Sequence, residues 1–328
     1  MSGEAQGKLT PDYQASGSMI AALAGVSPYQ TPNDCLKRAF AAVDNGGVYS
    51  GEREYIEAAE WGNKHEGDIL RGTMQKLQID ADLEIMKPFQ HPTLPLAVSL
   101  DGIGHGNDME FTTDPGQNIY VVGRDSIILE GPGILEAKLT AARPRDEPPP
   151  FRGPLQVQAA MMCTAYKWAA IGTLYGGTEL RVYLYGLEVA IQMKIGADVL
   201  DFASRVKQYR DHGDRDWYPA MTPNDAAATW RRVDDGDGPI ELTDELSELA
   251  MEYDACMKAQ RAIAKQKEAI TTEIQNYMAN HDLATVIEDG KQIGTVTWGM
   301  SPARKEYTVE AKPAARSKSI KVEMFDDE

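Results

Sequence analysis

The residues best suited to chemistry are Glu136 and Lys138, which interrupt the otherwise apolar stretch GPGILEAKLTA, residues 131–141. Side chains two positions apart on a strand point to the same face, so we expect both to lie beside Ile134. Opposite charges on a buried face need compensating groups. The pair is therefore either a structural ion pair, which is the simpler interpretation of so short a pattern, or half of an active site.

A third candidate is Asp101, which ends the apolar stretch AVSLDGIG immediately before a glycine. A carboxylate at a strand end and an E-x-K pair on a neighbouring strand can share Mg²⁺ or Mn²⁺, hard cations that prefer carboxylate oxygens. Such a metal activates water and neutralises the charge that builds on a phosphodiester. Lys138 could then orient or deprotonate the water and stabilise the pentavalent state. Glu66, expected in the middle of a preceding helix, could complete the metal shell.

The elements that must position these residues follow an α/β pattern over the first two hundred residues. We expect helices within residues 16–43, 52–77 and 155–177, the last ending at paired glycines. Strands are expected within residues 83–104 and 118–140, separated by a polar hairpin-like excursion at about 104–118. A proline-rich loop covers 141–154, and 178–195 is expected to form a strand, a turn and a second strand.

The rest of the chain predicts a separate helical part. Residues 211–240 are polar, acidic and rich in Gly and Pro, which predicts a linker after a domain spanning 1–210. Apolar residues then recur at 3–4 spacing from Leu242 to Tyr277, which predicts a long helix or a helical hairpin with one apolar seam. We interpret this seam as an intrachain or partner surface rather than as a long dimeric zipper. A β-hairpin around Asp289–Gly290 completes an extension over 241–300, and 301–328 is expected to be a flexible tail.

Composition narrows the class of protein. The chain has 328 residues, 42% hydrophobic, and no run of eighteen apolar residues, so no membrane span is expected. The first residues are polar and lack the apolar core of a signal peptide. Three cysteines lie far apart, which argues against a disulfide framework or a four-thiolate iron–sulfur cluster and favours a reduced cytoplasmic protein. A net charge of −17 speaks against a nucleic-acid binder, although residues 304–321 carry six Lys or Arg against two Glu.

Five motifs in one order carry a family resemblance. They are SGSMIAALAGVSPYQT, WGNKHEGDI, VSLDGI, ILEAK and PLQVQAAMMCTAYKW. Together they resemble the YqaJ-type viral recombinase family, the phage λ exonuclease-like members of the PD-(D/E)XK nuclease superfamily, over roughly residues 14 to 205. No single motif is specific, but their order favours an active site over an ion pair.

The resemblance implies a fold and an activity. The fold would be a restriction-endonuclease-like α/β core, a central mixed sheet flanked by helices, with a helical C-terminal extension. The activity would be Mg²⁺-dependent, or Mn²⁺-dependent, exonuclease resection of double-stranded DNA ends for phage recombination. A single-strand annealing protein as partner, a trimeric homo-oligomer and the cytoplasm of a bacterial host are also implied. A structure-specific endonuclease on the same core and a non-catalytic DNA-binding or assembly module remain as alternatives.

The resemblance also assigns roles residue by residue. Asp101 matches the motif aspartate, Glu136 and Lys138 match the E-x-K pair, and Glu66 matches the helical glutamate of a G-x-x-x-E element. The carbonyl of Ala137 would be a backbone metal ligand.

Further matches concern the substrate. Gln156 corresponds to the glutamine near the scissile phosphate, with Gln158 following it, and Ser18 and Ser99 fall where relatives hold a terminal 5′-phosphate. Two departures stand out. Relatives carry an arginine several residues before the Ser18 position, where this chain offers only Lys8, and the segment 102–133 is a long insertion.

Overall fold

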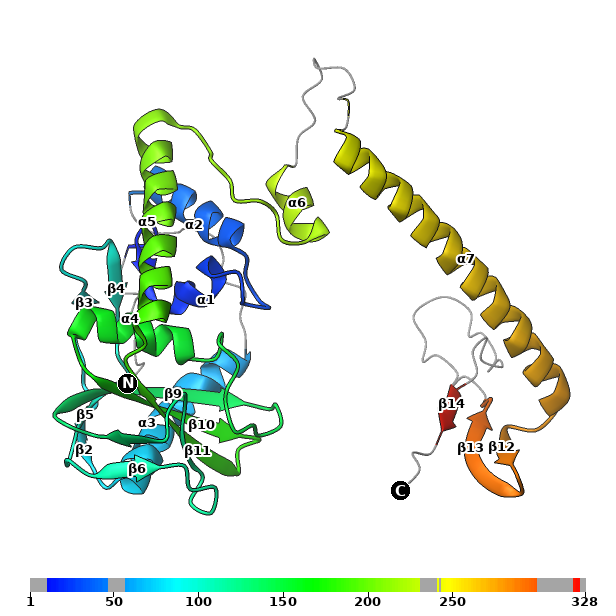
Figure 1. Ribbon diagram of the computed structural model, residues 1–328, viewed down its shortest axis with the longest axis horizontal. Coiled ribbons are helices and arrows are strands. Elements are labelled where there is room, and N and C mark those ends of the chain that lie inside the picture. Colours follow the sequence, from blue (N-terminus) through cyan, green and yellow to red (C-terminus); the bar gives the residue numbers. More distant parts are fainter. Residues whose placement is uncertain (1–10, 47–56, 231–240, 242, 300–320, 325–328) are drawn as a thin grey trace, which may run out of the picture. The chain divides into compact units, whose positions relative to one another are not determined.

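The structure is a computed structural model of the whole chain that describes residues 11–46, 57–230, 241, 243–299 and 321–324. The chain forms two compact units, residues 1–233 and 234–328. All the residues predicted to form the site fall within the first unit, whose helices and strands are labelled in Figure 1.

The centre of the first unit is a six-stranded mixed sheet in the order β2-β5-β9-β10-β11-β7. Strands β9 and β10 run parallel in the middle, β5 and β11 flank them in antiparallel orientation, and β7 pairs parallel to β11. Their bounds are β2 Asp80–Asp82, β5 Gly102–His105, β7 Ile119–Val121, β9 Pro132–Thr140, β10 Trp168–Tyr175 and β11 Glu179–Gly186.

Two small sheets accompany the central one. One has the order β1-β4-β3, and the other pairs β6 with β8. Their bounds are β1 Ala15–Ser16, β3 Phe89–Gln90, β4 Leu96–Val98, β6 Glu110–Thr112 and β8 Ser126–Ile128.

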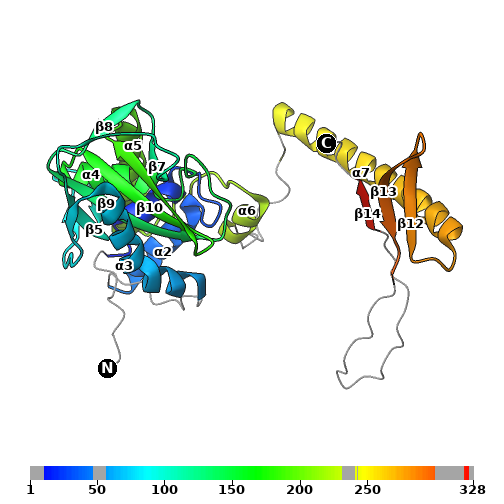
Figure 2. The same ribbon diagram turned by 90° about the horizontal axis from the view of Figure 1, so that it is seen from below.

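Helices cover both faces of the central sheet (Figures 1 and 2). Leu70 and Leu77 of α3 pack with Leu135 and Trp168 on one face. The other face, which carries Ile134, packs against α1, α4 and α5. The bounds are α1 Ile20–Leu23, preceded by the short 3₁₀ helix η1 Gly17–Met19, then α2 Pro32–Asp44, α3 Glu57–Leu77, α4 Pro154–Thr164, α5 Val189–His212 and α6 Pro223–Thr229. The predicted architecture, a mixed sheet between helices, is confirmed.

The helix expected over 155–177 is wrong in its second half. Helix α4 ends at Thr164, Ala165 adopts the left-handed conformation with φ 60°, and the chain continues as β10. A central strand buried on both faces has no polar alternation, so its sequence resembles a buried helix. Trp168 begins this strand and lies over Gly133, where an added Cβ would come within 2.1 Å of the indole ring.

The second strand expected within 178–195 is also wrong. Strand β11 forms, but the chain then enters α5. The buried residues of α5 recur at intervals of three and four, and they are Ile195, Val199, Phe202 and Val206. Only the first turns of this helix fell within the stretch assigned to a strand, too short a window for the helical period to show.

The expected linker is partly folded onto the first unit. Asn33 donates from Nδ2 to the carbonyl of Tyr218 at 3.0 Å and to Asp225 Oδ2 at 3.3 Å. Asp225 is buried and belongs to α6. The acidic composition of 211–240 therefore does not indicate a linker throughout, because Asp225 is buried and accepts hydrogen bonds. The boundary between the two units lies at residue 233 rather than at 210.

The excursion expected at 104–118 is more than a hairpin. Strands β6 and β8 pair with each other, and β7 lies between them in the chain and joins the far edge of the central sheet beside β11. The insertion at 102–133 thus extends the sheet itself.

The second unit contains one long helix and a small sheet. Helix α7, Asp244–Met278, is uninterrupted, so the hairpin alternative for this region is wrong. Strands β12 Leu283–Glu288 and β13 Lys291–Thr297 form a hairpin whose turn is Asp289–Gly290, and β14 Lys321–Met324 pairs with β13. The remainder of the predicted tail, with its basic residues at 304–318, lies outside the described residues.

The sequence predicts neither a membrane-spanning helix nor a disulfide framework, and the described part of the chain bears on both expectations. No helix in it has the length and apolarity needed to cross a bilayer. None of the three cysteines, all of which the structure describes, forms a disulfide: Cys35 is buried, Cys163 is half-buried and Cys256 is exposed.

Candidate active site

Glu136, Lys138 and Asp101 meet where β5 and β9 part. The last β5–β9 pair joins Gly102 to Leu135, so Asp101 lies directly beside the stretch of β9 that follows. Asp101 Oδ2 accepts a hydrogen bond of 2.9 Å from the backbone N–H of Ala137. Pairing between the strands thus brings together carboxylates that are 35 positions apart in the sequence.

Lys138 is the hub of the polar contacts on this face. Its Nζ donates to Glu136 Oε1 at 2.5 Å and to Gln156 Oε1 at 3.1 Å. Alternation along β9 puts both charged side chains on the face of Ile134, as the sequence predicted. Gln156 arrives from the first turn of α4, which begins with Pro154 after Gly153 at φ 110°.

Glu66 approaches from α3. Partial burial raises the pKa of its carboxyl, the charge of Asp101 raises it further, and Lys138 opposes the shift. Glu66 is therefore close enough to feel both groups electrostatically. All five residues predicted to be catalytic, Glu66, Asp101, Glu136, Lys138 and Gln156, belong to one neighbourhood.

The neighbourhood holds more negative than positive charge. Three carboxylates face one ammonium group, and Glu136 is only 3% exposed. Burial, reinforced by the charge of Asp101, raises the pKa of Glu136 to about 7 in spite of Lys138. Burial likewise raises the pKa of Asp101. A buried site with surplus carboxylate charge needs a proton or a cation, and the donor set suits a hard divalent ion.

The backbone of Ala137 fits the same role. In a strand, the N–H and C=O of one residue point to the same edge. Since the N–H of Ala137 points to Asp101, its carbonyl faces that side too, beyond the last β5–β9 pair. Within the described residues, no three His, Cys, Asp or Glu side chains form a ready metal cluster. Lys138 Nζ donates to Glu136 Oε1, so a cation would bind this carboxylate through its other oxygen, Oε2.

The segments that carry Ser18 and Ser99 pack against α4, the helix of Gln156. The parallel β1–β4 pairing matches Ser16 with Ala97, and each predicted serine stands two residues further along its segment. Gly17, which precedes Ser18, packs closely against both Val98 and Gln156. A Cβ added at Gly17 would lie 3.1 Å from the Val98 side chain and 3.5 Å from the Gln156 side chain. Both serines are exposed, and Ser18 Oγ is 3.3 Å from Ser16 Oγ.

Gln158, predicted to bind substrate, is instead a structural residue. It is 1% exposed, its Nε2 donates to the Gly186 carbonyl at 2.8 Å, and its Oε1 accepts from the Glu188 N–H at 3.1 Å. Gln192 also approaches Gln158 Oε1 at 3.3 Å. Two residues along a helix span 200°, so Gln158 faces away from its neighbour in the QVQ motif and joins α4 to the start of α5.

Trp61, which was not among the residues predicted from sequence to form the site, lies on α3 five positions before Glu66. Trp61 is 47% exposed and stacks on His65, with ring centroids 5.7 Å apart, while Lys64 Nζ lies 4.7 Å from the Trp61 ring. The i, i+4 spacing within WGNKHE was the available signal. An exposed indole flanked by a cation can stack on a nucleic-acid base.

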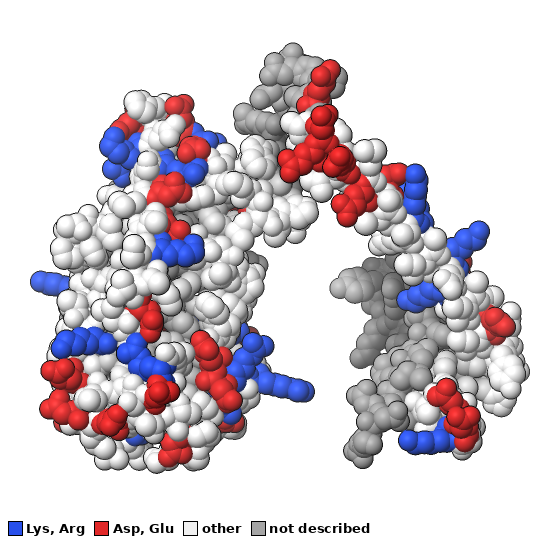
Figure 3. All heavy atoms as spheres, in the orientation of Figure 1, with Lys and Arg blue, Asp and Glu red and all other residues white. Residues whose placement is uncertain are grey.

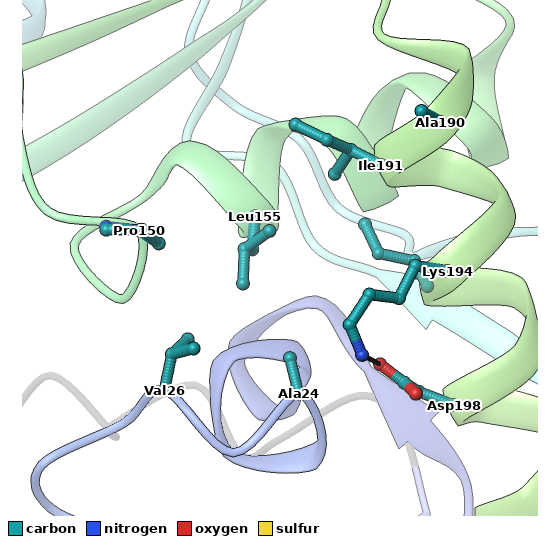
Figure 4. Close-up of a pocket in the computed structure, with 9 residues that line it drawn as sticks. Ala24, Val26, Pro150, Leu155, Ala190, Ile191, Lys194 and Asp198 are labelled. Carbon is teal, nitrogen blue, oxygen red and sulfur yellow. Dashed lines mark hydrogen bonds and ion pairs between the residues drawn. The ribbon is translucent and has the colours of Figure 1, made fainter.

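A separate hollow between the end of α1, the loop before α4 and the start of α5 is apolar (Figure 4). Its volume is about 300 Å³, and its walls include Val26, Pro150, Leu155 and Ile191. The charged pair at its side, Lys194 and Asp198, is 3.3 Å apart and mutually satisfied. Among the residues that line this hollow, Asp198 is the single carboxylate, in contrast to the cluster around Glu136.

Comparison with known proteins gives distant structural likenesses. No family model matches the sequence, and no curated protein matches it. LHK-Exo in complex with dAMP has a TM-score of 0.44 and 13% identity, covering 62% of this chain and 92% of that one. The alkaline exonuclease LHK-Exo from Laribacter hongkongensis has a TM-score of 0.44 and 14% identity, covering 61% and 91%. SSO0001 has a TM-score of 0.29 and 11% identity, covering 61% and 79%. At these values we take no residue role from any of them.

Proposed function

We propose that the first unit hydrolyses DNA phosphodiesters with Mg²⁺ or Mn²⁺ and acts as an exonuclease on double-stranded ends. The observation that carries the proposal is the convergence of Glu66, Asp101 and Glu136 on a single lysine at the point where β5 and β9 part. A structural ion pair would need one carboxylate. Surplus buried carboxylates suit a metal-dependent site.

The roles follow from the geometry. Asp101, Glu136 and the Ala137 carbonyl, with Glu66, would hold the cation, which supplies activated water and a counter-charge for the phosphate. The neighbouring carboxylates raise the pKa of Lys138 above its ordinary value despite burial. Lys138 is therefore an ammonium donor at neutral pH, and we assign it to orienting water and stabilising the charge on the phosphate rather than to removing a proton. Gln156 holds the Lys138 ammonium in place.

Preference for ends is supported by the two serines. Ser18 and Ser99 offer exposed hydroxyls on segments that pack against α4, and Gly17 permits the close approach of the first segment to Gln156. Hydroxyl groups can hold the oxygens of a terminal phosphate. Within this proposal, resection serves phage-type recombination in the host cytoplasm, with a single-strand annealing protein as partner and a homo-oligomer, a trimer by resemblance, as the working form.

The decisive experiment is digestion of end-labelled linear and covalently closed circular duplex DNA in Mg²⁺, with Asp101→Ala as the matched inactive control. Degradation of linear DNA alone supports the exonuclease. Nicking of circles would favour a structure-specific endonuclease on the same cluster. If wild type and Asp101→Ala both bind DNA and neither cleaves it in Mg²⁺ or Mn²⁺, the chain is a non-catalytic module and the proposal fails.

A further inference from the structure

Helix α7 exposes an apolar seam along nearly its whole length. The exposed large residues of the seam are Leu246, Leu249, Tyr253, Ile263, Ile270 and Tyr277, at intervals of three or four or their sums. Of the described residues of this 35-residue helix, only Met278 is buried. Its neighbour in the sequence, the β12–β13 hairpin, leaves the seam uncovered.

An exposed apolar seam of this length is expected to be covered by a partner. Helices in proteins owe most of their stability to packing of an apolar face rather than to propensity. A contiguous exposed apolar stripe with 3–4 spacing marks a protein interaction surface. Because α7 is one continuous helix, it has no second arm of its own to cover the seam.

The charges of α7 are segregated along its axis. Residues 244–254 carry five acidic and no basic side chains, and residues 258–267 carry four basic and no acidic ones. Figure 3 shows the acidic group at the start of the helix and basic side chains further along it. One base, Lys267, occupies a position of the seam itself.

This pattern distinguishes between orientations of a helix pair. A parallel pair in register would place acid on acid and bury Lys267 against its own copy, which is unfavourable. An antiparallel pair can align Tyr253 with Ile263, and the same register aligns Leu246 with Ile270 and Leu249 with Lys267. Three acids stand within about one turn of Leu249, and they are Glu245, Glu248 and Glu252. The lysine of one copy would thus lie among the acids of the other.

We propose that α7 is a self-association element that pairs antiparallel with α7 of a second copy of this chain, which reverses our interpretation of the seam from sequence. The apolar seam contacts the other seam, and the acidic half of each helix faces the basic half of the other. Nucleic acid is a poor occupant, since the first part of the helix is acidic and the seam is apolar. The proposal is independent of the nuclease activity.

Disulfide trapping in the full-length protein tests both contact and orientation. Leu249→Cys and Lys267→Cys chains, carrying different tags and both with Cys256→Ser, are mixed, oxidised and resolved without reductant. We expect a cross-linked band that contains both tags, and much less product from either variant alone. The control mixes Ala255→Cys with Ala262→Cys, which meet at nearly the same axial level but lie away from the seam, and it should cross-link poorly.

Two results would overturn the proposal. One is cross-linking of the seam pair at the level of the control. The other is efficient cross-linking of Leu249→Cys or Lys267→Cys alone, which would indicate a parallel arrangement.

Charge reversal gives a second measurement by sedimentation of the full chain. Lys267→Glu should raise the dissociation constant of the α7 pair by about tenfold or more, and adding Glu252→Lys should reverse that change. An unchanged constant in Lys267→Glu, or no recovery in the double variant, would also contradict antiparallel pairing.

Discussion

Replacing Glu136 with glutamine should stabilise the metal-free protein at alkaline pH, although it removes a group from the proposed active site. Glutamine has nearly the same shape and its Oε1 can still accept from Lys138. What it removes is a carboxylate charge that is 3% exposed and faces the charges of Asp101 and Glu66. A stabilising effect would show that the cluster carries surplus negative charge.

The magnitude follows from the pKa. The carboxyl of Glu136 titrates near its ordinary value of 4.5 in the unfolded chain and at about 7 in the folded one. A group whose pKa is raised on folding favours the folded state most below pH 4.5, and that contribution is lost as pH rises through 7. At pH 8 the charged carboxylate should lower the free energy of unfolding by about 3 kcal/mol, and at pH 5.5 by about 1 kcal/mol.

Thermal unfolding in EDTA at the two pH values measures this difference. For a unit of this size, 3 kcal/mol corresponds to an increase in Tm of about 6–12 °C for Glu136→Gln at pH 8. Glu130→Gln is the matched control, since Glu130 is exposed and pairs with Lys167 at the surface, and it should change Tm little. Adding Mg²⁺ at pH 8 should raise Tm of the wild type more than that of Glu136→Gln, because the cation neutralises the carboxylate only where one exists.

A Glu136→Gln protein less stable than wild type at pH 8 without metal would refute the reasoning. It would mean that the attraction between Glu136 and Lys138 outweighs burial and carboxylate repulsion. The pair would then be a structural ion pair.

The remaining predictions concern individual side chains. Asp101→Ala should abolish Mg²⁺-dependent cleavage while DNA affinity in a gel-shift assay is kept or increased, because a metal ligand and a negative charge are lost together; near-wild-type turnover would contradict the assignment. Lys138→Gln should lower kcat by roughly 10²–10⁴-fold in single-turnover assays, and a loss of Tm with full activity would leave Lys138 only a structural role. Gln158→Ala should lower the free energy of unfolding by about 1–3 kcal/mol, since the Gly186 and Glu188 backbone groups lose their partner. Gln156→Ala should lower kcat with little change in Tm, and the reverse pattern for the two glutamines would contradict their assignment.

The sequence was sufficient for local features with a clear physical rule. Period-two alternation placed Glu136 and Lys138 on one face of a strand. The strand expected to end at Asp101 instead ends at Val98, and Asp101 immediately precedes β5, which begins at Gly102. Asp289–Gly290 indicated a two-residue hairpin turn, where both residues adopt positive φ. The alternation of helical and strand patterns was enough for the mixed α/β class.

Sequence failed where burial removes the polar contrast that reveals a period. Strand β10, which is apolar on both faces, resembles a helix for this reason. The start of α5 resembles a strand for a different reason, because its apolar residues Val189, Ile191 and Met193 alternate with others at the exposed surface. Gln156 and Gln158 look equivalent in the motif QVQ. Only the direction in which α4 packs separates the one that holds Lys138 from the one that supports the backbone before α5.

Only the tertiary structure decided the electrostatics of the site. From their residue types alone, the simpler interpretation of Glu136 and Lys138 is an ordinary structural ion pair. Strand pairing brings Asp101 to Ala137, helix packing brings Glu66 within range, and burial raises the pKa of Glu136 to about 7. Charge interactions depend on distance and on exclusion of water, and neither quantity is local in sequence. The chain therefore specifies its candidate chemical groups locally, while the surplus charge that suits them to a cation exists only in the folded unit.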